Sequence, residues 1–189
     1  MKTSRALFFL LVLCLGISKA QENKSSEYYG HSLNAGIGYS YYRYVGYSVP
    51  VWRADYEFQI DHHLTVAPLV AMYSYKGDYV WGDESSNEFR AYDYEETVIP
   101  VALKVTRYFD DLLFACANKW DIYASGSLGY ILRKRTWEPG YTGRKDIEPG
   151  TGPMYLDFHV GTEYHLTKTL GLQLDLSTGM TTLGLAFHL

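Results

Sequence analysis

Charged and polar side chains recur inside apolar stretches of this 189-residue chain, and they are the groups that could do chemistry. A histidine oriented by a carboxylate can activate a serine, and His159 lies near Asp157 and Glu163 in sequence. Ser127 and Ser177 are the candidate nucleophiles. Spacing does not establish that geometry, and a network of paired charges is the simpler interpretation, because a buried charge without its partner costs about 3–5 kcal/mol. The expected members of this network are Arg53, Asp55, Glu57, Lys104, Arg133, Asp157, His159, Glu163 and Asp175.

A metal site has weak support in the sequence. His62 and His63 follow Asp61 in an expected turn, and two adjacent histidines without a spaced third ligand are more typical of a turn than of a zinc site. The acidic segment from 76 to 94 lacks the ligand spacing of a calcium loop. We therefore expect no metal, no cofactor and no catalytic residue.

Apolar and polar residues alternate with period two through most of the chain, and no stretch has the periodicity of an amphipathic helix. The predicted strands are Ser32 to Arg43, Val51 to Ile60, Leu64 to Tyr75, Glu95 to Phe109, Trp120 to Arg133, Met154 to Tyr164, Leu170 to Ser177 and Thr181 to Leu189. Their average length of about 11 residues is what a tilted strand needs to cross the hydrocarbon core of a bilayer.

Each predicted strand has one apolar and one polar face. In the seventh strand, Leu170, Leu172, Leu174 and Leu176 alternate with Gly171, Gln173, Asp175 and Ser177. The apolar face lines the interior of a soluble barrel but faces lipid in a membrane barrel. The polar faces also carry small residues such as Gly36, Gly129 and Gly161, and this mixture suits the narrow interior of eight strands. We predict an all-β fold, an eight-stranded antiparallel up-and-down transmembrane β-barrel.

Aromatic residues supply a second reason to place the apolar face outside. If the strands run alternately up and down, two sets of aromatic side chains gather near opposite rims, as in the interfacial girdles of membrane barrels. One set is Phe58, Phe109, Trp120, Tyr164 and Phe187, and the other includes Trp52, Tyr130 and Trp137. The alternative is that tyrosine and tryptophan are frequent here because they favour strands.

The first twenty residues have the layout of a cleaved signal peptide: a basic start, an apolar stretch from Ala6 to Ile17 and small residues before Gln21. We divide the chain into a signal peptide (1–20), a polar leader (21–31) and a barrel (32–189). Cleavage removes three of the 17 basic residues and leaves 21 acidic ones, a net charge of about −7. Such a charge argues against nucleic acid as a partner.

The signal peptide, the tyrosine- and glycine-rich opening strand at 32–39, the segment at 121–130 and the closing segment at 183–189 together resemble a known family. The mature chain is similar to small eight-stranded outer-membrane β-barrel domain proteins of the OmpA/OmpX-type plan. The resemblance covers nearly all of the mature chain and implies location in the outer membrane. The family's terminal strand usually ends in an aromatic residue, whereas here Leu189 is last and the aromatic is Phe187.

The predicted function is structural, adhesive or surface-recognising, with a closed polar lumen. The expected partners are outer-membrane lipid and lipopolysaccharide for a monomeric barrel, with a possible surface ligand on two long loops, 76–94 and 134–153. The first alternative is a secreted, lipocalin-like barrel that binds an apolar ligand and turns residues such as Leu172 and Phe158 inward. The others are a lipid A-modifying barrel enzyme and a narrow pore.

Overall fold

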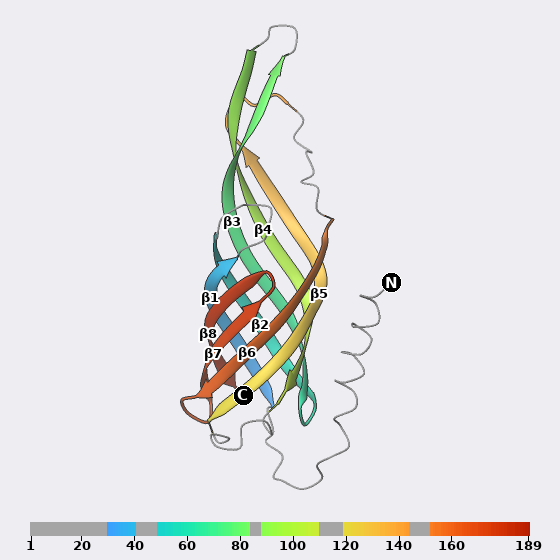
Figure 1. Cartoon of the computed structure of the whole chain (residues 1–189), viewed down its shortest axis with the longest axis vertical. Helices are drawn as coiled ribbons and strands as arrows, with labels where there is room; N and C mark the ends of the chain where they lie inside the picture. Colours follow the sequence, from blue (N-terminus) through green and yellow to red (C-terminus); the bar gives the residue numbers. More distant parts are fainter. Residues whose placement is uncertain (1–29, 41–48, 84–87, 110–118, 144–151) are drawn as a thin grey trace, which may run out of the picture.

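Eight antiparallel strands form a closed barrel in the computed structural model, which describes residues 30–40, 49–83, 88–109, 119–143 and 152–189 (Figure 1). The strands are β1 (His31–Ser40), β2 (Val49–Asp61), β3 (Leu64–Asp83), β4 (Glu88–Tyr108), β5 (Trp120–Trp137), β6 (Met154–His165), β7 (Leu170–Ser177) and β8 (Met180–His188). Each strand pairs with the next, and β8 pairs with β1. The predicted eight-stranded up-and-down barrel is confirmed. Within the described residues, no helix has the length and apolarity to span a membrane.

The two ends of the barrel differ in shape. We call one end the terminal mouth: β1 begins there, β8 ends there, and residues 62–63 form a tight turn. The opposite end, the hairpin mouth, carries the short β7–β8 turn at 178–179 and a long projection of β3 and β4 (Figure 1). The predicted signal peptide and the leader up to residue 29 lie outside the described residues. His31 already belongs to β1, where it pairs with Phe58.

Strands β3 and β4 are 20 and 21 residues long and project beyond the barrel as a two-stranded hairpin. The prediction of a loop from 76 to 94 is therefore wrong for residues 76–83 and 88–94, which pair from Lys76↔Glu95 to Asp83↔Glu88. The predicted strands end at Tyr75 and begin again at Glu95, whereas the aromatic residues between them continue the alternation of the strands below. The predicted loop 134–153 is also too long, because β5 continues to Trp137.

Side chains alternate between the lumen and the outer wall along every strand, as the pleat requires. The apolar face lies outside: Leu128, Phe158 and Val160 are 58%, 60% and 59% exposed. Leu172 is also exposed, so the inward apolar face required by the lipocalin-like alternative is not the arrangement of this barrel. Glycines on the inner face make room for larger groups, since a Cβ at Gly161 would lie 2.2 Å from the Tyr123 ring.

Candidate functional site

Asp55 lies at the centre of a charged network that fills the lumen. Lys104 Nζ lies 2.7 Å from Asp55 Oδ2, and Arg53 Nη2 lies 3.0 Å from Asp55 Oδ1. The side-chain amide of Asn34 donates a third hydrogen bond to Oδ2, at 2.9 Å. Both oxygens of this carboxylate are therefore occupied by donors from β1, β2 and β4.

Glu57, one pleat nearer the terminal mouth, shares Lys104 with Asp55. Lys104 Nζ lies 2.7 Å from Glu57 Oε1, while the hydroxyls of Thr65 and Tyr108 donate to Glu57 Oε2, both at 2.8 Å. Lys104 is fully buried, and its ammonium group bridges two carboxylates of one strand. This arrangement satisfies the charge of Lys104 without solvent, as a buried ion pair requires.

Asp175 connects the network to β7 and holds a histidine. Arg53 Nη1 lies 2.6 Å from Asp175 Oδ1, and Tyr123 donates to Oδ2 at 3.0 Å. His159 Nδ1 lies 2.8 Å from Asp175 Oδ1, and its Nε2 lies 3.1 Å from Ser127 Oγ. A serine, a histidine and an aspartate are thus joined in the order that nucleophilic catalysis uses.

The serine and the histidine of this arrangement are buried. Ser127 is 1% exposed and His159 2% exposed, inside a lumen filled by the charged network. Asp175 Oδ1 is also shared between His159 and Arg53. The arrangement joins strands β5, β6 and β7 by hydrogen bonds.

Asp157 is a buried carboxylate near the hairpin mouth. The hydroxyls of Tyr155 and Ser177 donate to Asp157 Oδ2 at 2.9 Å and 2.8 Å. The Thr178 hydroxyl and the backbone N–H of Gly179, at 3.1 Å, donate to Oδ1. A single buried carboxylate therefore holds the tight β7–β8 turn.

A second cluster lies at the terminal mouth, where β5, β6 and β8 end or begin. His188 Nε2 lies 2.6 Å from Glu163 Oε1, and His165 Nε2 lies 2.7 Å from Asp121 Oδ2. His165 Nδ1 also lies 3.7 Å from Glu163 Oε1. The two imidazole side chains are 15% and 24% exposed, in contrast to the sealed centre of the lumen.

On the hairpin projection, aromatic side chains occupy the face that continues the inner face of the barrel. Tyr141 is 6% exposed and stacks on Trp137 with ring centroids 4.0 Å apart. It also meets the edges of Trp81 and Tyr92. Tyr94 lies 5.3 Å from Trp137, and the Arg135 guanidinium lies 4.8 Å from the centre of the Tyr94 ring. This aromatic cluster joins the tail of β5 to the β3–β4 hairpin.

Eight of the nine residues expected in the lumen network lie buried inside the barrel: Arg53, Asp55, Glu57, Lys104, Asp157, His159, Glu163 and Asp175. The exception is Arg133. Its position on β5 belongs to the inward-facing set, but its side chain reaches the hairpin mouth, where Nε lies 3.7 Å from Glu96 Oε1. The sequence reasoning missed Glu96, Asp121 and His165. Glu96 lies on the same face of β4 as Lys104, and Asp121 lies on the same face of β5 as Tyr123, because each pair is an even number of residues apart. This spacing could have identified both residues from the sequence.

The aromatic residues expected in the girdles lie on the outer wall, with one exception. Exposed fractions reach 64% for Trp52 and 68% for Tyr130, and 41% for both Trp120 and Phe187. Phe58 is 40% exposed, while Phe109 and Tyr164 are half-buried. Trp137 was wrongly assigned to a girdle, because the extension of β5 turns it into the aromatic cluster.

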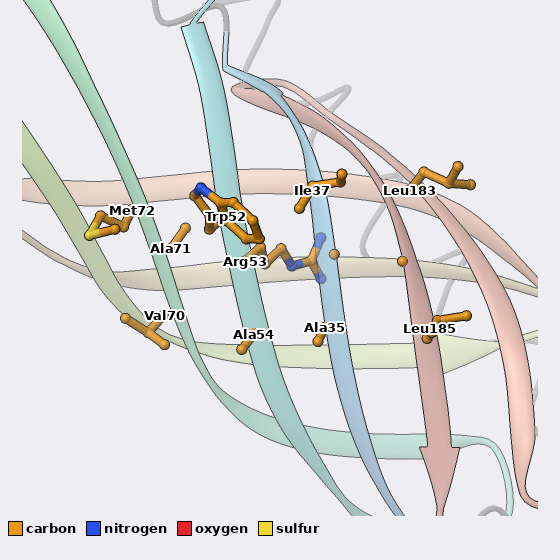
Figure 2. A pocket seen from close by; sticks show the side chains of 12 residues that line it. Ala35, Ile37, Trp52, Arg53, Ala54, Val70, Ala71, Met72, Leu183 and Leu185 are labelled. Carbon is orange, nitrogen blue, oxygen red and sulfur yellow. The ribbon is translucent and has the colours of Figure 1, made fainter.

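A shallow hollow of about 510 Å³ lies on the outer wall over β8, β1, β2 and β3 (Figure 2). Its floor is formed by Ala35 and Ala54, which pair across β1 and β2, and larger apolar side chains such as Trp52, Met72 and Leu183 surround it. The hollow opens away from the lumen and is almost wholly apolar. Its apolar lining is suited to a hydrocarbon chain.

No protein-family model matches the chain, and no curated protein matches it. Among solved structures, it is similar to Ail, the attachment invasion locus protein of Yersinia pestis, in complex with the heparin analogue sucrose octasulfate (10% identity, 83% of this chain and 96% of that chain covered, TM-score 0.46). It is also similar to Neisserial surface protein A (13%, 84% and 95%, TM-score 0.47) and to a de novo designed transmembrane β-barrel (10%, 88% and 98%, TM-score 0.45). These TM-scores lie below 0.5, and the barrel fold is established by the strand pairing described above.

Proposed function

We propose that the chain is an outer-membrane β-barrel protein with a structural, adhesive or surface-recognising role. The observation that carries this proposal is the inverted polarity of the barrel. Asp55, Lys104 and Asp175 are at most 3% exposed inside, while apolar side chains cover the outer wall. In water this wall would be a large exposed apolar surface, far beyond what monomeric soluble proteins tolerate. Contact with lipid removes the free-energy cost of exposing this apolar surface to water.

The outward aromatic residues support a particular placement in the bilayer. Trp120 and Tyr164 pair across β5 and β6 with ring centroids 4.8 Å apart near the terminal mouth. Tyr130 lies ten residues further along β5, toward the hairpin mouth. Aromatic side chains with polar tips favour the membrane–water interface. We propose that these residues mark the two interfaces, with the terminal mouth in the periplasm and the hairpin outside the cell.

The lumen network supports a closed barrel that neither conducts nor catalyses. Its charges are paired with one another across the lumen, and its serine, histidine and aspartate are inaccessible to a lipid substrate. We propose that the network is a structural plug. The protein then acts through its outer surface and the parts that project from the membrane.

The hairpin projection is the part of the described chain best placed for recognition. The aromatic cluster stiffens one of its faces, while Val80 and Phe89 are 57% and 60% exposed on the other. The Arg90 side chain is 63% exposed near the tip. Exposed aromatic and arginine side chains on a rigid support are typical of binding surfaces. We propose that the monomeric barrel presents this hairpin to a ligand at the cell surface, beside lipopolysaccharide.

Cysteine accessibility along β7 tests the membrane proposal. In folded protein reconstituted in lipid vesicles, cysteines at Leu172 and Leu174 should resist water-soluble thiol reagents and react with a lipid-soluble one. A cysteine at Val80, which is exposed on the hairpin projection, is the matched control and should react with the water-soluble reagent. Recovery in the outer-membrane fraction and a heat-modifiable gel mobility are also expected. A monomer that stays soluble without detergent would rule the proposal out.

The recognition proposal needs a separate test. Cells that display the protein are compared with cells that display the double variant Val80→Ser/Phe89→Ser in attachment to a cultured epithelial monolayer. A loss of attachment is expected because the exposed apolar tip is removed while the aromatic cluster on the other face is kept. The matched control is Ile60→Ser, at an exposed apolar position near the terminal mouth. Equal attachment by both variants and the parent chain would contradict a role for the hairpin.

A further inference from the structure

We propose that the terminal mouth holds a site for a divalent transition metal, Zn²⁺ by its donor set, formed by Glu163, His165 and His188. One ligand atom from each of these residues lies within 4.8 Å of the other two. Two imidazoles and one carboxylate are a donor set that zinc takes with a fourth position left for water. The site is distinct from the sealed network in the middle of the lumen.

The orientation of His165 supports this assignment. Its Nε2 is 2.7 Å from Asp121 Oδ2, so that nitrogen is held by a carboxylate while Nδ1 faces Glu163. A carboxylate that fixes the far nitrogen of a metal-binding histidine is the usual second partner of such ligands. Asp121 is itself 1% exposed and anchored, because its backbone oxygen accepts a hydrogen bond from Thr162 at 2.9 Å.

The distances fit a metal ion after one hydrogen bond opens. His165 Nδ1 and Glu163 Oε1 are 3.7 Å apart, close to the separation of two ligand atoms that each lie about 2.0–2.1 Å from zinc in tetrahedral geometry. His188 Nε2 and Glu163 Oε1 are 2.6 Å apart, a hydrogen bond that the ion would replace. The imidazole centroids of His165 and His188 lie 5.1 Å apart, so both rings border the same space.

The backbone leaves a cradle for the carboxylate. Glu163 on β6 reaches across β7 to His188 on β8, and the β7 residue beneath it is Gly171. A Cβ at Gly171 would lie 1.9 Å from Glu163 Oε1, so any larger residue there would displace the carboxylate. The next residue across, Ala186, is also small. The ion would therefore cross-link β6 to β8 over β7 at the end of the closing strand.

Access and donor type favour zinc over the hard cations. The two imidazole side chains are 15% and 24% exposed, so an ion from the surrounding water can reach them. Magnesium and calcium prefer oxygen ligands, whereas imidazole nitrogens suit zinc, copper and nickel. In this mouth, the ion would offset the negative charge of Glu163 and Asp121.

Zinc titration of the folded chain in detergent micelles tests the site. A chromophoric chelator competes for the metal, and Co²⁺ substitution supplies a second signal in the visible absorption bands of tetrahedral coordination. We expect one ion per chain. His165→Ala and His188→Ala should each weaken binding by tenfold or more. Asp121→Asn should weaken it by about 10–100-fold, the usual effect of losing a partner that orients a ligand.

Two further variants separate this site from adventitious binding. His62→Ala removes an exposed histidine from the turn at the same mouth and should leave the affinity unchanged. Gly171→Ala keeps every ligand but displaces the Glu163 carboxylate, so it should weaken zinc binding while heat-modifiable mobility shows that the barrel is folded. Zinc binding that survives His165→Ala/His188→Ala, or that is lost with His62→Ala, would overturn the proposal.

Discussion

The middle of the lumen and the hairpin projection share strands β3, β4 and β5 but are held together by different interactions. In the barrel, β4 contributes Lys104, which is buried between Asp55 and Glu57. In the projection, the same strand contributes Tyr92 and Tyr94, which pack against Tyr141 and Trp137. Paired charges fill one region and aromatic rings cover the inner face of the other.

The difference follows from what surrounds each region. Within the barrel, the outer face is apolar, so polar groups have no place except the lumen, where they must satisfy one another. The projection extends beyond the part of the barrel whose outer face is apolar. Its charged residues can therefore face water, and its aromatic rings can pack against one another as a small core. The same alternation of residues thus gives a polar interior in the barrel and an inner face of packed aromatic rings in the projection.

The largest expected loss of stability comes from a substitution in the lumen. Lys104→Met leaves Asp55 and Glu57 without their shared cation and should lower the free energy of unfolding by about 3–5 kcal/mol. Urea-induced unfolding in lipid vesicles, followed by tryptophan fluorescence, measures this change. Lys134→Met, at an exposed position of β5, is the control and should have little effect. Equal effects of the two substitutions would contradict the role of Lys104.

A substitution on the opposite face of β4 should lower the free energy of unfolding almost as much. Val105 follows Lys104 and is 42% exposed on the outer wall. Val105→Arg places a charge in lipid and should cost about 2–4 kcal/mol if the residue lies near the midplane of the bilayer. The same unfolding experiment applies, with Val80→Arg on the projection as the control. A soluble barrel would tolerate both changes equally.

Tyr141→Ala should loosen the projection and spare the barrel. Each ring pair in the aromatic cluster contributes roughly 0.5–1.5 kcal/mol beyond its buried area, and Tyr141 takes part in three of them. Limited proteolysis should then cut near the hairpin while heat-modifiable mobility is retained. Tyr39→Ala, at an exposed position on β1, is the matched tyrosine. Loss of the whole barrel would show that the two regions are not independent.

Ser127→Ala tests whether the buried serine, histidine and aspartate act as a plug or as a catalyst. Removing the hydroxyl removes the hydrogen bond between Ser127 and His159 Nε2 and should cost about 1 kcal/mol of stability. The mass spectrum of lipid A from cells expressing the variant should equal that from cells expressing the parent chain. A lipid A species that depends on Ser127 would show that the lumen does chemistry.

Arg90→Ala should have the smallest effect. Arg90 Nη2 lies 2.6 Å from Glu138 Oε1, but the arginine side chain is 63% exposed. Solvent weakens such pairs, which usually contribute about 0.2–1 kcal/mol. Unfolding and proteolysis should both be nearly unchanged. A large loss would indicate that the pair anchors the tail of β5 more firmly than its exposure suggests.

The sequence indicated the barrel because strand alternation is a local property. The leucines of β7 alternate with Gln173 and Asp175 whatever the fold, and eight such strands leave few architectures. Parity also indicated which charges share a face, so most of the lumen residues could be named in advance. The lengths of β3 and β4 could not, because the contacts of Tyr79 with Trp137 and of Tyr92 with Tyr141 join segments that are distant in sequence.

Contacts between strands distant in sequence were decided by the tertiary structure alone. Alternation places His159 and Asp175 on inner faces, but the register of β6 and β7 determines that their side chains meet at 2.8 Å. The registers of β6 with β7 and of β7 with β8 together bring His165 and His188 to one mouth, although neither was expected near a metal. The sequence by itself determined which side chains share a face of a strand, since that depends on each strand's own period, and the structure showed which of the two faces points inward. Which of them touch depended on the stagger of neighbouring strands in the closed barrel.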